Sequence, residues 1–266
     1  MTKEVSDVIL AGIDMGIETT KVVIMKDGAV IGRAKTSTGG IDRPKQAELA
    51  YKAALEDAGI SPADVDKVSA TGKGKYDISF AEKRVTETIA AVHAGKHLCP
   101  DLTSVMSVGS DEVLIATIGK KLLVGEYVLN QKCSAGIGTF LQMIACRLEL
   151  PIERLGELDT EDTPVINDNC IVFAELDVLD LLNNGVEPEK IAAACVKAAA
   201  VSAARAANDL TIPANDKVVL IGGLTNNKAF VKALEKQLGF GFVIPEDAEY
   251  AGAIGAAISG EKGIKA

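Results

Sequence analysis

The stretch VILAGIDMGIETTKVVIM (residues 8–25) contains two apolar runs separated by a short polar turn. The runs Val8–Asp14 and Thr20–Met25 are rich in β-branched residues, which favours strands. After them, Lys26-Asp27-Gly28 has the composition of a tight hairpin turn, so a third strand is expected at Ala29–Thr36. The chain therefore opens with three consecutive strands.

The turn after the first strand reads Asp14-Met15-Gly16-Ile17-Glu18-Thr19-Thr20-Lys21. It lies between two strands, so it is neither a Walker loop nor a Rossmann fingerprint, both of which precede a helix. Backbone N–H groups and hydroxyls in such a hairpin suit phosphates, and Asp14 suits a hydrated Mg²⁺. An ordinary hairpin rich in Gly and Thr is the alternative interpretation.

A similar order of elements is expected twice along the chain. The first series continues with a helix over 44–58, a strand over 65–70 and a helix over 80–95. The second has strands at 103–108, 112–117, 121–129 and 217–221, with helices near 133–149, 170–184, 187–208, 226–238 and 250–259. We expect an α/β protein of two related lobes closing on a cleft. The first covers 1–102 and is completed by a C-terminal helix at 247–266, and the second covers 103–246.

The composition excludes several classes of partner. A net charge of −9 argues against nucleic acid and anionic membranes, which select basic surfaces. The sequence shows no signal-peptide pattern, and no apolar run reaches the roughly 20 residues that span a bilayer. We expect a cytoplasmic protein whose five cysteines stay reduced.

Two cysteines stand just ahead of predicted helices, in Asn130-Gln131-Lys132-Cys133-Ser134-Ala135-Gly136-Ile137-Gly138 and in Asn167-Asp168-Asn169-Cys170-Ile171-Val172-Phe173-Ala174-Glu175. Unpaired N–H groups at a helix N-terminus favour the thiolate, which binds iron–sulfur clusters. A cubane cluster needs four ligands, so two cysteines per chain predict a cluster shared between two subunits. Two buried thiols are the alternative.

Two later segments are rich in glycine. Strand 217–221 passes through Gly222-Gly223 towards a helix that contains Asn226, an arrangement that lets a flat purine or ribose approach the backbone. Near the end, Ala251-Gly252-Ala253-Ile254-Gly255-Ala256-Ala257 is a helix of small residues, which suits a close crossing of two backbones.

The order of Asp-x-Gly-x-x-Thr-Thr-Lys, a mid-chain Gly-Asp turn, Gly-Gly-x-x-x-Asn and Ala-Gly-Ala-x-Gly-Ala-Ala resembles the acetate kinase, sugar kinase, Hsp70 and actin superfamily. The segments that begin at Cys133 and Cys170 resemble one branch, the BadF/BadG/BcrA/BcrD-type ATPases. That branch contains activators of 2-hydroxyacyl-CoA dehydratases and ATP-binding subunits of benzoyl-CoA reductase. The resemblance implies two ribonuclease-H-like lobes of the actin/Hsp70 type around a nucleotide cleft.

The resemblance also implies a mechanism, in which ATP hydrolysis drives an electron from ferredoxin through a [4Fe–4S] cluster to a catalytic reductase or dehydratase partner. One cluster is shared by a dimer of homologous ATPase subunits, with Cys133 and Cys170 as its ligands in each. Asp14 and Asp111 become catalytic, with ATP and Mg²⁺ as cofactors. The nucleotide would contact Gly16, Thr19, Thr20, Lys21, Gly109, Ser110, Gly222, Gly223 and Asn226.

One departure from the family pattern affects the predicted function. The second phosphate loop usually reads Asp-x-Gly-Gly-Gln-Asp, whereas this chain has Ser107-Val108-Gly109-Ser110-Asp111-Glu112. The change favours the smaller ATP-binding subunit of a benzoyl-CoA reductase over a homodimeric dehydratase activator. A small-molecule kinase and a regulatory subunit that does not hydrolyse ATP are further alternatives.

Other polar and sulfur residues have simpler interpretations. Cys146 and Cys195 lie in apolar helices and are expected in the core, and Cys99 is expected at a helix end before Pro100. His93 and His97 have the i, i+4 spacing of a zinc pair, but a solvated helix end is the preferred interpretation. Glu175 is expected to be a solvated charge, to pair with Lys132 or to tune the cluster.

Overall fold

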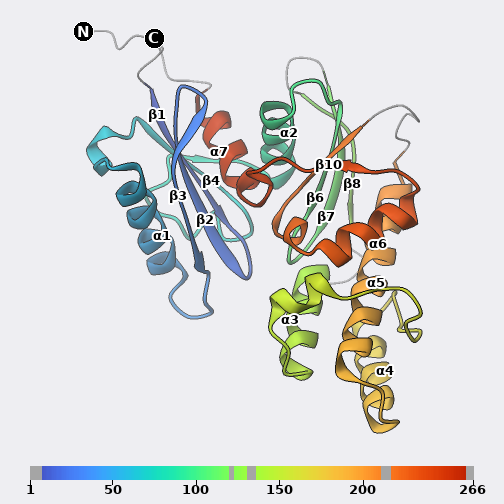
Figure 1. Ribbon diagram of the computed structural model, residues 1–266. Coiled ribbons are helices and arrows are strands. Elements are labelled where there is room, and N and C mark those ends of the chain that lie inside the picture. The colour runs from blue at the N-terminus through green and yellow to red at the C-terminus, as the bar shows by residue number, and fades with distance from the viewer. Residues whose placement is uncertain (1–7, 120–122, 131–135, 211–216, 262–266) are drawn as a thin grey trace. The chain divides into compact units, whose positions relative to one another are not determined.

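The computed structural model describes residues 8–119, 123–130, 136–210 and 217–261 (Figure 1). The chain divides into two compact units. Unit 1 comprises Met1–Thr103, Ile118–Gly125 and Tyr250–Ala266, and unit 2 comprises Ser104–Thr117 and Glu126–Glu249. Within the described ranges, no helix is both long and apolar enough to cross a membrane.

The sheet of unit 1 has five strands in the order β3-β2-β1-β4-β5. The hairpins predicted at the start of the chain form β1 (Ile9–Met15), β2 (Thr19–Lys26) and β3 (Ala29–Ser37), which pair antiparallel. On the other side of β1, β4 (Lys67–Thr71) and β5 (Lys83–Arg84) pair parallel. β1 is therefore the central strand, and its C-terminal end lies beside that of β4.

Helices cover both faces of this sheet because successive side chains of a strand point to opposite faces. Val22 and Ile24 of β2 pack in the cluster that contains α1 (Arg43–Ala58), whereas Val23 and Met25 pack with α7 (Ala251–Glu261). α7 also packs against α2 (Glu87–Leu98). A Cβ on Gly255 would lie 1.9 Å from the carbonyl oxygen of Ala90, so the small residues of α7 do permit a close helix crossing.

The sheet of unit 2 has the same order of strands, β8-β7-β6-β9-β10. Its central strand β6 (Ser104–Val108) pairs antiparallel with β7 (Val113–Ile118) and parallel with β9 (Val218–Ile221). β8 (Val124–Asn130) and β10 (Phe242–Val243) form the two edges.

The helices of unit 2 are α3 (Ile137–Arg147), α4 (Ile171–Asn183), α5 (Pro188–Asn208) and α6 (Lys228–Leu238). All four contribute side chains to one core, together with β6, β7 and β9. The alanine-rich α5 lies at its centre, with Ile191, Cys195 and Val196 fully buried.

One glycine in each unit sits directly after the parallel neighbour of the central strand. Gly72 follows β4 with φ +86°, and a Cβ there would lie 2.4 Å from the carbonyl oxygen of Met15 at the end of β1. Gly222 follows β9 with φ +101°, and a Cβ there would lie 2.3 Å from the carbonyl oxygen of Val108 at the end of β6. Each unit thus contains the same kind of backbone contact between its central strand and the neighbouring parallel strand, and both units have the same order of strands.

Most elements expected from the sequence are present, and the differences have local causes. The helix expected at 80–95 begins only at Glu87, because Thr86 caps it by accepting a hydrogen bond from Ile89 N and the preceding residues form β5. Two-residue strands such as β5 and β10 are too short for an alternating pattern to reveal.

We expect Gly72→Ala to lower the free energy of unfolding by about 3 kcal/mol, because it combines a left-handed backbone with a backbone clash. Gly40→Ala is the matched control, since a Cβ there would meet no atom of the described residues within 4 Å. It should change the stability by less than about 0.5 kcal/mol. Urea unfolding measures both, and equal stabilities would refute the close contact.

Candidate nucleotide and cluster-ligand sites

Asp14 occupies a narrow space at the C-terminal end of β1. In register it lies opposite Thr71 of β4. A Cβ on Gly72 would lie 2.6 Å from Asp14 Oδ1, and a Cβ on Gly252 of α7 would lie 2.4 Å from Oδ2. Only hydrogen atoms fit on those two sides of the carboxylate, so the fold makes room for Asp14 by placing glycines around it.

Three charged groups from other segments act on Asp14: Lys21 of β2, Lys75 after β4 and Glu87 of α2. Burial raises its pKa, and the nearby Glu87 acts in the same direction, while Lys21 and Lys75 oppose the shift. Lys75 Nζ donates to both carboxylate oxygens of Glu87, at 3.2 and 3.3 Å, and to the carbonyl oxygen of Gly72 at 3.1 Å. This mixed cluster suits a site that binds both a cation and phosphates.

Lys75 and Glu87 were not among the site residues expected from the sequence. The segment Thr71-Gly72-Lys73-Gly74-Lys75 directly after a strand was the available signal, because glycines at a strand end commonly precede a ligand loop. Glu87 lies in the first turn of α2, where an acidic residue also has an ordinary role in stabilising the helix.

The hairpin between β1 and β2 is held by its own polar groups. Gly16 N donates to the carbonyl oxygen of Thr19 at 3.0 Å. The hydroxyls of Thr20 and Thr38 lie 3.0 Å apart, and that of Thr38 also donates to the carbonyl oxygen of Gly16 at 3.0 Å. Lys21 Nζ donates to Thr19 Oγ1 at 2.9 Å. The hairpin is thus organised before any ligand binds, and its phosphate contacts stay a prediction.

In unit 2, the loop after β6 packs tightly against the start of α3. Thr139 N donates to the carbonyl oxygen of Ser110 at 3.0 Å. A Cβ on Gly136 would lie 2.1 Å from the same oxygen, and a Cβ on Gly138 would lie 2.7 Å from Ser110 Cα. Both glycines of the segment that follows Cys133 therefore serve a backbone contact with residues 109–111 of the predicted second phosphate loop, 107–112.

The turn after β9 lies close to this loop. The approach of Gly222 to Val108 places both segments at the C-terminal ends of neighbouring parallel strands, where open α/β sheets bind ligands. Gly222 N donates to the carbonyl oxygen of Ala248 at 2.8 Å, and Asn226 Nδ2 donates to Glu249 Oε2 at 2.9 Å. Gly223 begins a short 3-10 turn.

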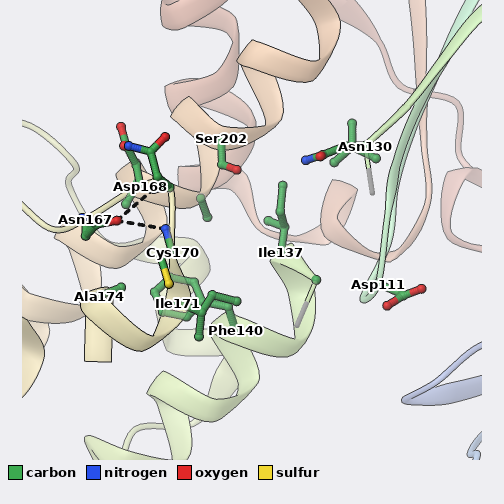
Figure 2. A pocket seen from close by; sticks show the side chains of 15 residues that line it. Asp111, Asn130, Ile137, Phe140, Asn167, Asp168, Cys170, Ile171, Ala174 and Ser202 are labelled. Carbon is green, nitrogen blue, oxygen red and sulfur yellow. Dashed lines mark hydrogen bonds between the residues drawn. The ribbon is translucent and has the colours of Figure 1, made fainter. Parts of the chain in front are cut away.

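Cys170 immediately precedes the first residue of α4, as the sequence predicted, and its side chain is partly exposed (Figure 2). Its backbone N–H donates to Asn167 Oδ1 at 2.9 Å. A cavity open to solvent is lined by Cys170, by Ile137 and Phe140 of α3, by Ser202 of α5 and by Asp111. One cavity thus connects the predicted second phosphate loop with Cys170. Cys133 falls outside the described residues.

The model of one protein family, described as the BadF/BadG/BcrA/BcrD ATPase family, matches residues 11–260. The chain belongs to this ATPase family. It is 30% identical over 251 residues to an activator of lactoyl-CoA dehydratase from Anaerotignum propionicum, covering 93% of this chain and 95% of that protein. It is 31% identical over 266 residues to a subunit of the benzoyl-CoA reductase from Thauera aromatica, covering 95% and 93%.

The fold class is confirmed by a solved structure. Component A of (R)-2-hydroxyglutaryl-CoA dehydratase from Acidaminococcus fermentans superposes with a TM-score of 0.85 and 28% identity, over 96% of this chain and 98% of that one. The resemblance inferred from the two cysteine segments and the glycine motifs is thereby confirmed at the level of the family.

The other described cysteines of this ATPase differ from Cys170. Cys195 is buried as expected, and burial, reinforced by the charge of Asp177, raises its pKa to about 12. Burial also raises the pKa of Cys99. The expectation that Cys146 is a core residue is wrong, because its side chain is exposed on the outward face of α3.

The expectation for His93 is also wrong, and one of the three alternatives for Glu175 is excluded. His93 is buried and not solvated, with Nδ1 2.8 Å from Ser259 Oγ, although its partner His97 is exposed. Glu175 of α4 is not a solvated surface charge, because it forms an ion pair with Arg147 of α3. Lys132, its other expected partner, lies outside the described residues.

The donor chemistry at Cys170 fits one ligand of an iron–sulfur cluster. The thiol is accessible, it precedes a helix, and the side chains beside it in the cavity are mostly apolar. In the part of the chain that the structure describes, no group of three or more His, Cys, Asp or Glu side chains gathers around a point. Cys170 is therefore the one proposed cluster ligand within that part, and the cluster itself stays a prediction.

The raised pKa of Asp14 generates a pH-dependent prediction. The native state holds a proton on Asp14 more readily than the unfolded state does, so ionised Asp14 destabilises the fold above its ordinary pKa of 3.8. We expect Asp14→Asn to raise the Tm of the nucleotide-free and Mg²⁺-free protein at neutral pH. The gain should shrink towards about pH 4, where the native carboxyl is already protonated.

Thermal unfolding between about pH 4 and 8 measures this difference. Asp101→Asn is the control, since Asp101 is exposed and its replacement should leave the profile unchanged. A lower Tm for Asp14→Asn at neutral pH would mean that the charge stabilises the fold.

Proposed function

We propose that this protein couples ATP hydrolysis to the transfer of low-potential electrons towards an enzyme that acts on a CoA thioester. Ferredoxin is the electron donor, and a [4Fe–4S] cluster is shared by two homologous subunits. Cys133 and Cys170 of each subunit are the proposed ligands. The observation that carries the proposal is the accessible thiol of Cys170 before α4, in one cavity with Asp111 of the predicted phosphate loop.

The nucleotide roles follow from the environment of each motif. Asp14, enclosed by two glycines and close to Lys21, Lys75 and Glu87, is proposed to hold hydrated Mg²⁺. Asp111 is proposed to orient the attacking water. The remaining contacts to ATP are assigned to backbone and side-chain groups of Gly16, Thr19, Thr20, Lys21, Gly109, Ser110, Gly222, Gly223 and Asn226.

The contact between Ser110 and α3 supports a link between the two sites. Because Gly136 and Gly138 leave no free space beside Ser110, a shift of loop 109–111 must displace the start of α3. α3 begins four residues after Cys133. A change of phosphate state thereby reaches a proposed cluster ligand through backbone contact. When bound, such a cluster stores and passes on single electrons, and its potential depends on burial and hydrogen bonding.

A second subunit is supported by the apolar face of α4. Val172, Phe173, Leu176 and Leu179 are between 41% and 64% exposed. Phe173, Leu176 and Leu179 are spaced by three residues and Val172 precedes Leu176 by four, which places all of them on one side of the helix. This apolar stripe starts two residues after Cys170, where a subunit that shares the cluster has to approach. Contiguous exposed apolar side chains mark surfaces that bind another protein.

Two assignments of this subunit are consistent with the relatives. We favour the smaller ATP-binding subunit of a benzoyl-CoA reductase, because loop 107–112 departs from the usual motif and a sister subunit would supply the regular one. A homodimeric activator of a 2-hydroxyacyl-CoA dehydratase is the second candidate, since relatives named as dehydratase activators are about as similar as the reductase subunit.

Cys170→Ala tests the cluster. Purified without oxygen, the wild-type dimer should hold about four irons and bleach in air. The variant should lose that iron and still bind ATP, because Cys170 is not one of the proposed ATP contacts. Cys146→Ala is the control, an exposed cysteine with no proposed role, and should retain full iron. Full iron in Cys170→Ala would remove this ligand from the proposal.

Leu176→Glu tests the apolar stripe. We expect it to weaken subunit association about tenfold or more, because a carboxylate would be buried against apolar side chains. The fold should be unaffected, since Leu176 is 56% exposed in the single chain. Light scattering under anaerobic conditions measures the change in mass. Leu49→Glu on α1, where Leu49 is 47% exposed, is the control and should leave association unchanged.

A further inference from the structure

The loop that presents Cys170 is held by an arginine from another helix. Arg205 of α5 forms an ion pair with Asp168, with Nη2 2.6 Å from Oδ2. Its Nη1 donates to Asn169 Oδ1 at 2.7 Å and to the carbonyl oxygen of Asp168 at 3.3 Å. One guanidinium therefore contacts three acceptors on the two residues directly before Cys170.

The same loop is also tied to α4. Asn167 Oδ1 accepts hydrogen bonds from Asn169 N at 3.1 Å and from Cys170 N at 2.9 Å, as the dashed lines in Figure 2 show. Asn167 N donates to Asp177 Oδ2, two turns into α4, at 2.7 Å. The backbone of Cys170 is thus anchored from both sides, which sets the direction of its Cα–Cβ bond.

These contacts are poorly suited to stabilising the fold as a whole. The side chain of Arg205 is 47% exposed and that of Asp168 is 26% exposed, and ion pairs this open to water contribute little to stability. Their effect is local, because all of them converge on the four residues 167–170. Hydrogen bonds one layer behind a metal ligand typically orient that ligand, and their loss costs about 10- to 100-fold in metal affinity.

We propose that Arg205 and Asn167 are positioning residues that hold Cys170 in the orientation required to ligate an iron–sulfur cluster. The inference rests on the proposed function and adds to it the residues that preorganise one ligand. A lysine at position 205 would keep the ion pair with Asp168. It would lose the simultaneous contact with Asn169, because an ammonium group lacks the planar fork of a guanidinium.

The test compares Arg205→Met and Arg205→Lys with wild type in two forms of the protein. In the iron-free chain, amide hydrogen exchange is measured on peptides that span 167–172. We expect exchange at Asn169 and Cys170 to speed up about tenfold in Arg205→Met and less in Arg205→Lys. In the iron-loaded protein, iron loss to a chelator should be about tenfold faster in Arg205→Met, with partial rescue by lysine, and the cluster's electron paramagnetic resonance spectrum should broaden.

Arg154→Met is the matched control. Arg154 is similarly exposed at 41% and bonds two carboxylates, but these belong to Glu157 and Glu189 and not to the Cys170 loop. It should leave exchange at 167–172 and iron loss unchanged. If Arg205→Met folds poorly, Asn169→Ala is the second variant. It removes one acceptor of Arg205 at an exposed position, and it should speed up hydrogen exchange and iron loss by a smaller factor.

The outcomes separate this inference from the proposed function. Wild-type exchange and wild-type iron loss in Arg205→Met would overturn the positioning role while leaving the cluster intact. Absence of iron from the wild type, alone or with a sister subunit, would overturn the cluster. The exchange experiment would in that case still report whether Arg205 orders the loop.

Discussion

The close approach of two parallel strands at a glycine is the contact on which both candidate loops depend. In unit 1, Gly72 lets β4 end against the carbonyl oxygen of Met15, and in unit 2, Gly222 lets β9 end against that of Val108. A side chain at either position would push the strand ends apart, since φ is positive and the nearest atoms are backbone. In each sheet, the C-terminal ends of the central strand and its parallel neighbour therefore lie close together. The loops after the central strands start from this edge.

This geometry explains why Asp14 carries an unfavourable charge. A carboxylate between Gly72 and Gly252 loses much of its hydration, so its pKa rises although two lysines are near. Thr71, opposite it in register, has a buried hydroxyl without a hydrogen-bond partner in the described structure. Unfavourable polar groups of this kind commonly mark places where a ligand supplies the missing interactions. The polar groups around Asp14 are therefore consistent with ATP and Mg²⁺ as the proposed ligands.

In unit 2, the corresponding strand ends lead towards the proposed cluster ligand Cys170. The loop after β6 lies against Gly136 and Gly138 at the start of α3, and the cavity beside that contact extends to Cys170 at the start of α4. Two helices that follow proposed cluster ligands thus begin around one cavity that Asp111 also lines. The short sequence Gly-Ile-Gly (136–138) is explained by this packing, because a Cβ at either glycine would collide with the loop backbone.

The sequence by itself determined the strand and helix order, the family and the place of Cys170 before a helix. These features depend on periodicity within short windows and on residue types with strong local preferences, such as Gly, Thr and the β-branched residues. Tertiary structure alone decided which residues meet: Lys75 and Glu87 beside Asp14, and Arg205 on the loop before Cys170. It also decided that Cys146 is exposed and His93 buried, since an apolar helix does not reveal which of its faces is covered. Arg205 lies 36 and 37 residues along the chain from the two loop residues that it contacts, and no local pattern encodes such a contact.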